Sequence, residues 1–180
     1  MSKYPFMISK TRPLLTFTSL WLIIFLYSCA KDIGQVGGSG IKTDVQLWAF
    51  VQSQKLAWYK SDSTAPETSN SGFHQGAYYL RYNTKLKSQL DQDGTVPSGA
   101  DLADSSLAVK QLTNPALFAV ILKDSRSPYS SNGWVWAIFN PNGTIYKNYS
   151  ITQTGNPCTG CHTGGRDDML TFDAHPNYPN

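Results

Sequence analysis

The pattern of apolar and polar residues predicts one helix followed by a run of short strands. Apolar residues recur at roughly helical spacing over residues 45–59, and Asp44 stands where the N-cap of this helix is expected. After a polar loop, the apolar runs are short and bounded by turn residues, which is typical of strands. These strands are expected at residues 77–83, 106–112, 116–123, 133–140 and 143–150.

The connections between the strands favour an antiparallel sheet. The last two strands flank residues 140–143, Asn-Pro-Asn-Gly, a turn sequence that favours a hairpin. No helical pattern of crossover length separates the strands, which argues against a parallel sheet. We therefore expect a mainly β, α+β fold. It comprises an antiparallel sheet of about five strands, an N-terminal helix and a short helix near the C-terminus that holds the motif described below.

The N-terminus has the three-part pattern of a secretory signal. Three basic residues within the first twelve positions precede an uncharged stretch, residues 14–26, which is shorter than the about 20 residues of a spanning helix. Residues 26–29, Leu-Tyr-Ser-Cys, resemble a bacterial lipobox, in which the cysteine is acylated and becomes the first mature residue. Cys29 is therefore the expected lipidation site. An ordinary signal peptide or an uncleaved anchor that happens to contain a cysteine is the alternative.

This interpretation divides the chain into four parts. We expect a lipoprotein signal peptide at residues 1–28, a Gly-rich flexible tether at 29–43, one domain at 44–173 and a tail at 174–180. The lipid would be the only membrane contact of a protein in the periplasm or on the outer membrane of a Gram-negative bacterium. Ala30 resembles the residue that follows the cysteine in outer-membrane lipoproteins.

The charge distribution gives no reason to expect a nucleic-acid partner. All 12 acidic residues lie beyond residue 28, together with 12 of the 15 Lys and Arg residues, so the mature chain is close to neutral. No basic face is visible in the sequence.

Residues 158–162, Cys-Thr-Gly-Cys-His, match the C-x-x-C-H motif of c-type haem attachment. Two thiols within one turn can form thioethers with both vinyl groups of a haem, and the next histidine then ligates the iron. A redox dithiol usually stands near the start of a βαβ unit, and a zinc site needs about four ligands. We therefore expect one covalent haem c held by Cys158 and Cys161, with His162 as the iron ligand.

The sixth coordination position of the iron has no strong candidate. Once the signal is removed, Met169 is the remaining methionine, and it lies close behind His162 in the chain. His74 follows a flexible loop and His175 lies in the tail. An open, five-coordinate iron is therefore expected, and it suits the binding of small molecules.

Apolar strand residues are candidates for the wall of such a pocket. Phe118 and residues 134–139 are placed to cap the open side of the haem, and a wall of low polarity favours uncharged gases. Ordinary core packing is the alternative for the same residues.

Together these residues resemble the cytochrome P-460 and cytochrome c′-beta family, small mostly-β haem proteins whose C-x-x-C-H motif lies near the C-terminus. The resemblance runs from about Trp48 to Phe172. It rests on matching order and rough spacing of segments 104–112, 119–125, 133–143, 158–162 and 167–172.

The resemblance implies roles for particular residues. In members that oxidise hydroxylamine, the lysine of a V-K-E motif is linked to the haem macrocycle, and this catalytic position falls on Lys110. A solvated or paired surface lysine is the alternative. The carboxylate that accepts protons in those members is replaced here by Ala119. The arginine of the first strand falls nearer Tyr78, with Arg81 a few residues away.

The resemblance also implies three possible functions. In the first, a haem-dependent oxidoreductase binds hydroxylamine or nitric oxide and passes electrons to an external acceptor, with Lys110 tuning the haem. In the second, a non-catalytic protein binds nitric oxide or carbon monoxide, which Ala119 and Phe118 would suit. The third, an electron-transfer cytochrome, requires two strong-field axial ligands. Family members are typically homodimers, so a homodimer is expected.

Overall fold

The computed structural model describes residues 38–58, 66–69, 75–92, 94–153, 157–162 and 167. The expected signal peptide, the tail, most of the tether, and Cys29, His74, Met169 and His175 lie outside these residues. No helix within the described ranges combines the length and the apolar character needed to cross a membrane.

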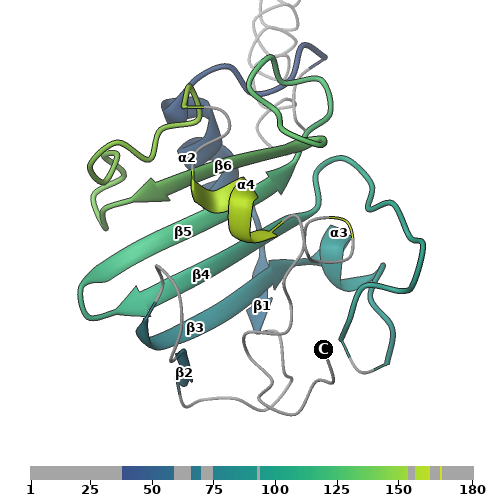
Figure 1. Cartoon of the computed structure of the whole chain (residues 1–180), viewed down its shortest axis with the longest axis horizontal. Helices are drawn as coiled ribbons and strands as arrows, with labels where there is room; N and C mark the ends of the chain where they lie inside the picture. Colours follow the sequence, from purple (N-terminus) through teal and green to yellow (C-terminus); the bar gives the residue numbers. More distant parts are fainter. Residues whose placement is uncertain are drawn as a thin grey trace, which may run out of the picture. The chain divides into compact units, whose positions relative to one another are not determined.

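The described residues form one six-stranded antiparallel sheet and three helices (Figure 1). The sheet order is β1-β3-β4-β5-β6, and β2 also pairs with β3. This arrangement confirms the predicted mainly β, α+β class. The elements are α2 (Asp44–Ser53), β1 (Leu56–Trp58), β2 (Glu67–Ser69), β3 (Gly76–Asn83), α3 (Thr84–Lys87), β4 (Leu107–Thr113), β5 (Ala116–Lys123), β6 (Trp134–Phe139) and α4 (Pro157–His162).

Helix α2 is capped by Thr43, one residue before the predicted cap. The Gln46 backbone N–H donates to the Thr43 side chain at 3.1 Å, and the Thr43 N–H donates to the Gln46 side chain at 3.1 Å. This reciprocal pair is a capping box. Asp44 is instead the first helical residue, where the partial positive charge of the helix N-terminus favours a carboxylate.

Helix α2 ends at Ser53, although the apolar pattern predicted a helix as far as residue 59. Its buried residues are Leu47, Phe50 and Val51, which follow helical spacing. The next apolar residues, at positions 56 and 58, are two apart, which is the period of a strand. They belong to β1, which pairs with the end of β3.

The fold begins at Gly40, within the segment expected to be a flexible tether. Ile41 is buried; its N–H donates to the Asp124 carboxylate at 2.5 Å, and its carbonyl accepts from the Ser127 hydroxyl at 2.5 Å. Gly40 has a φ of +72°, and a Cβ there would lie 2.5 Å from the Ser127 nitrogen. The end of the expected tether therefore packs against the loop that follows β5.

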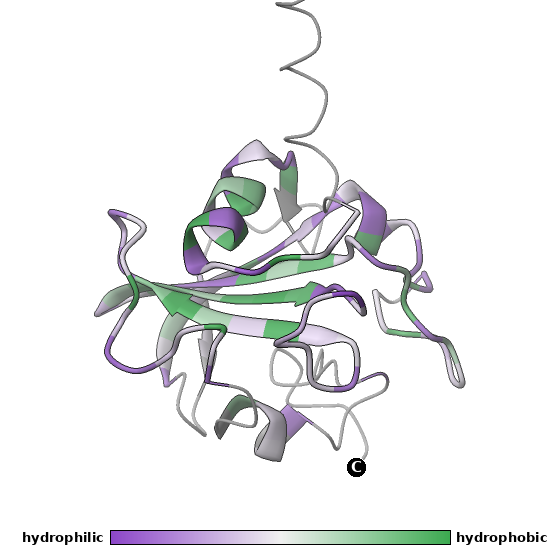
Figure 2. Cartoon of the chain, turned by 90° about the horizontal axis from the view of Figure 1, so that it is seen from above, coloured by the Kyte–Doolittle hydropathy of each residue, from purple (hydrophilic) through white to green (hydrophobic). Residues whose placement is uncertain are grey.

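The sheet presents two different faces, because neighbouring side chains of a strand point in opposite directions. The α2 face carries Val109 and Val120, which are aligned in register and packed in the core with α2. The α4 face carries Lys110 opposite Ala119, and Trp136 of β6. Figure 2 shows α2 and α4 on opposite sides of the sheet.

The strand predicted after the Asn-Pro-Asn-Gly turn is not formed, so that prediction was wrong. The turn itself closes, because the Asn140 N–H donates to the Thr144 carbonyl at 2.8 Å. Beyond it, the described residues form the isolated bridge between Phe139 and Ile145. Lys147 has a φ of +50°, in the left-handed region, and this conformation interrupts the extended backbone.

Candidate functional site

The C-x-x-C-H motif forms helix α4, which lies on the side of the sheet opposite α2. Cys158 and His162 are four residues apart, so they lie on the same side of the helix, and both side chains are half-buried. The His162 ring meets the edge of the Trp136 ring, with centroids 4.6 Å apart and planes at 62°. Nothing is described of the Cys161 side chain. The described part of the motif therefore faces the sheet.

Lys110 and Ala119 share this face and stand directly opposite each other on β4 and β5. Directly opposed residues of an antiparallel pair have Cβ atoms about 4.5–5.5 Å apart. Ala119 is also opposite Ile138 of β6, two residues from Trp136. The structure therefore brings the motif, Lys110 and Ala119 to one side of the sheet.

Lys110 is held by an aromatic ring from the neighbouring strand. Its Nζ lies 4.0 Å from the centroid of the Tyr78 ring, which is 1 % exposed. Such a contact favours the charged ammonium group over a neutral amine. Tyr78 lies on the α4 face, whereas the register of Arg81 with Val109 places Arg81 on the α2 face. Of Tyr78 and Arg81, it is therefore Tyr78 that lies on the same face as Lys110 and contacts it. Its neighbour on that face, Leu80, stands directly opposite Lys110.

Phe118 lies on the opposite face from the motif, which corrects its expected role in a pocket wall. It precedes Ala119 in β5, so the pleat turns its side chain toward α2. Its ring meets Trp48 of α2 edge to face, with centroids 5.5 Å apart. The run 134–139 is divided in the same way, and Trp134, Trp136 and Ile138 are its members on the α4 face. Phe118 belongs to the α2 core.

Two tyrosines that were not predicted from the sequence pack on the same buried cluster as Ala119. Tyr146 and Tyr149 stack at 6.3 Å with planes 8° apart, and both pack with Ala119 on one buried cluster of the α4 face. In a regular strand, residues three apart would face opposite ways. Here the left-handed Lys147 lets both tyrosines bond to the backbone of Ile138, at 2.8 and 3.0 Å. No sequence pattern signalled this turn.

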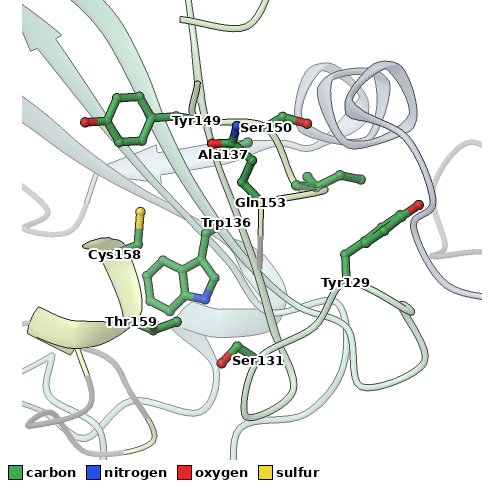
Figure 3. A pocket seen from close by; sticks show the side chains of 10 residues that line it. Tyr129, Ser131, Trp136, Ala137, Tyr149, Ser150, Gln153, Cys158 and Thr159 are labelled. Atoms are coloured by element: carbon green, nitrogen blue, oxygen red, sulfur yellow. The ribbon is translucent and has the colours of Figure 1, made fainter. Parts of the chain in front are cut away.

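A pocket adjoins α4 at the outer edge of β6 (Figure 3). Its lining includes Cys158 and Thr159 of α4, Trp136 of β6 and Tyr149. The Trp136 indole Nε1 is buried and has no hydrogen-bond partner among the residues that the structure describes. An indole N–H is only a donor, and a buried donor without a partner is costly. The residues present are chemically suited to a haem, whose propionate oxygens accept hydrogen bonds and whose ring packs against aromatic side chains such as Trp136 and Tyr149.

A mainly β protein with a C-x-x-C-H helix on one face of its sheet has the build of a haem-binding protein. The sequence model of the cytochrome P-460 family matches residues 50–172, and the chain belongs to this family. This match confirms the family predicted from the sequence, and it supports haem as the cofactor. No curated protein and no solved structure matches the chain.

The separation of the two faces predicts separate effects of their residues. Phe118→Ala should lower the free energy of unfolding by about 2 kcal/mol, less than for a fully buried ring, because it removes a half-buried ring that packs against the α2 core. The absorption spectrum of the haem-loaded protein should stay the same. Urea denaturation and an absorption spectrum measure the two effects. Trp136→Ala is the matched variant on the other face, and it should change the spectrum. A changed spectrum in Phe118→Ala would contradict this division.

Proposed function

We propose that this protein is an exported, lipid-anchored c-type haem protein that binds hydroxylamine or nitric oxide at an open iron and oxidises it. The observation that carries the proposal is the placement of Lys110, the family's cross-linking position, on the sheet face that α4 covers. The expected lipid at Cys29 and the expected periplasmic or outer-membrane location belong to this proposal. So does the expected homodimer.

Each residue of the site has a defined task in the proposed protein. Cys158 and Cys161 hold the haem by thioether bonds, and His162 ligates the iron. When bound, the haem supplies a metal that takes up a small nitrogen compound and passes its electrons on. Lys110 presents a positive charge, or a covalent bond, on the same face. Tyr146 and Tyr149 add stacked aromatic rings to the buried cluster against which Ala119 also packs.

The oxidation needs an external partner and an outlet for protons. Conversion of hydroxylamine to nitric oxide releases three electrons and three protons. The electrons pass to an external one-electron acceptor. The protons have no carboxylate at position 119 to receive them. Water must therefore accept them, so we expect slow turnover.

A digest of the haem-loaded protein tests the proposed role of Lys110. Mass spectrometry should find the Lys110 peptide joined to the haem-bearing peptide that contains residues 158–162. Lys110→Arg is the control, because arginine keeps the charge and cannot form the same link. An unmodified Lys110 peptide from fully matured protein would show that the cross-link does not form. The proposed oxidation would then lose the observation that carries it.

Binding of nitric oxide or carbon monoxide without catalysis is the second candidate. Ala119 favours it, because the position that carries a proton acceptor in hydroxylamine-oxidising members holds a methyl group. The stacked tyrosines beside it add an aromatic wall of the kind that suits a small uncharged gas. Steady oxidation of hydroxylamine with an added electron acceptor would decide against this candidate. The electron-transfer cytochrome stays a prediction that a six-coordinate, low-spin ferric spectrum would support.

A further inference from the structure

A carboxylate five residues behind His162 is bound to the sheet. Of residues 163–180, the structure describes Asp167, whose carboxylate oxygens lie 2.7 and 3.0 Å from the Lys123 Nζ. The Leu102 N–H donates to the same carboxylate at 2.8 Å, and the Trp134 indole N–H at 3.3 Å. Asp167 also has a φ of +48°, a conformation that costs energy in a residue other than glycine. Four hydrogen bonds therefore hold one residue in an unfavourable backbone conformation.

Lys123 is the residue of the sheet that makes this contact. It ends β5 on the α4 face, on the same side as Ala119, and it is buried. Burial lowers the pKa of Lys123, but hydrogen bonds from its ammonium group to Asp101 and Asp167 outweigh this and raise the pKa above its ordinary value. The folded state therefore stabilises the charged form at neutral pH, and this contribution is lost as the pH rises through the raised pKa.

The two carboxylates that share Lys123 lie in very different places. The Asp167 side chain is 12 % exposed and belongs to the segment behind the haem motif. The Asp101 side chain, at 2.8 Å from the Lys123 Nζ, is 86 % exposed and belongs to the loop before β4. A charge pair that is largely removed from water is screened less than an exposed one. The contact with Asp167 is therefore the one that restrains the chain.

The haem motif lies between two attached points of the chain. Ahead of it, Asp44 accepts the Ile151 N–H at 2.9 Å and the Ser150 hydroxyl at 2.7 Å. Behind it, Asp167 is held by Lys123. Five residues of extended chain span at most about 18 Å, so fixing Asp167 limits how far His162 can move from the end of β5. Without the contact between Asp167 and Lys123, the chain would be attached by this pair of contacts only ahead of the motif.

A row of aromatic rings connects the same two residues through space. The Lys123 Nζ lies 5.2 Å from the Trp134 ring, whose indole N–H donates to Asp167. The Trp134 and Trp136 rings lie 6.4 Å apart, and Trp136 contacts His162 at 4.6 Å. A shift of Asp167 would therefore reach His162 both along the chain and through packed rings.

We infer that Lys123 is a positioning residue for the haem ligand: it fixes Asp167, five residues behind His162, on the sheet face that carries Lys110 and Ala119. This inference rests on the proposed function, because it requires haem on the C-x-x-C-H motif. Lys123 acts on the direction and distance of the His162 imidazole from the sheet. It takes no part in binding the small molecule.

The haem-loaded protein and four variants test this role. Lys123→Met and Asp167→Asn should shift or broaden the iron–histidine stretching band in the resonance Raman spectrum of the ferrous protein. They should also change carbon monoxide affinity by about 10-fold, the lower end of the effect that the loss of an outer-shell partner has on a metal site. Lys123→Arg keeps the charge and the reach to the carboxylate, so its band should match the wild type. Asp101→Asn is the matched control, because it removes the charge of a carboxylate that accepts a hydrogen bond of nearly the same length from the same lysine.

The outcomes separate this role from general stability and from the proposed function. Wild-type bands and affinities in folded Lys123→Met and Asp167→Asn would overturn the inference, as would an Asp101→Asn variant that behaves like Asp167→Asn. If Lys123→Met does not fold, Asp167→Asn decides alone, because its side chain keeps the shape of the carboxylate. A wild-type protein that matures without haem would overturn the proposed function itself, and it would show this before any variant is compared.

Discussion

Replacing both motif cysteines, Cys158→Ala with Cys161→Ala, in the Lys110→Arg background should yield a folded protein that loses its haem on a denaturing gel. The thioether bonds are the covalent link in the proposed attachment, so their loss leaves iron ligation by His162 alone. The fold should survive, because the two buried clusters that join the sheet to α2 and to the loop before β4 contain no residue of α4. Haem staining after electrophoresis measures the loss, and circular dichroism checks the fold.

Single-cysteine variants are the control for this result. Cys158→Ala should keep one thioether and therefore retain haem in the stained band, with a shifted spectrum from the remaining vinyl group. Haem that stays attached when Lys110 is replaced as well would show that the C-x-x-C-H motif is not the attachment site.

Restoring a carboxylate at position 119 should increase hydroxylamine oxidation. Ala119→Glu places a proton acceptor on the α4 face, opposite Lys110 and beside Tyr146 and Tyr149. A positioned general base contributes about 10²–10⁴-fold to a rate, and we expect the lower end because the pocket has not been shaped around this group. Steady-state oxidation with an added one-electron acceptor measures the effect on kcat.

Ala119→Gln separates proton transfer from a change of shape. The amide has nearly the size of the carboxylate but does not accept a proton at neutral pH, so its turnover should stay near that of the wild type. Equal rates in Ala119→Glu and Ala119→Gln would contradict a missing base as the cause of slow turnover. The nitric oxide affinities of the two variants should be compared as well, because both side chains fill the same space.

The sheet was predicted well where alternation of apolar residues is long. The expected strands at 77–83, 106–112, 116–123 and 133–140 agree with β3 to β6 to within one residue at each end. Strands β1 and β2 have three residues each, too few to show a period, and β2 reads Glu-Thr-Ser. Their pairing with β3 is a tertiary effect that local pattern does not contain.

The candidate site was predicted in part, because the sequence does not show which strand residues point to which face of the sheet. Lys110 and Ala119 were selected by the family resemblance, and their antiparallel register explains why two residues nine positions apart meet on one face. Phe118 was misplaced, because an apolar run without polar alternation does not show which residues face which side. Lys123 and Asp167 were not selected either, since their pairing spans 44 residues of sequence and depends on the folded path of the chain.

The alternation of side chains along β5 allows the α4 face of this protein to change without disturbing the layer that packs against α2. Positions 118, 120 and 122 pack toward α2, whereas Ala119 lies on the α4 face between the buried residues Leu117 and Ile121. A substitution at position 119 alters the chemical surroundings of a ligand on the α4 face and leaves the α2 layer as it was. Relatives of this fold are therefore able to diverge in the molecule they take up by single changes along one strand.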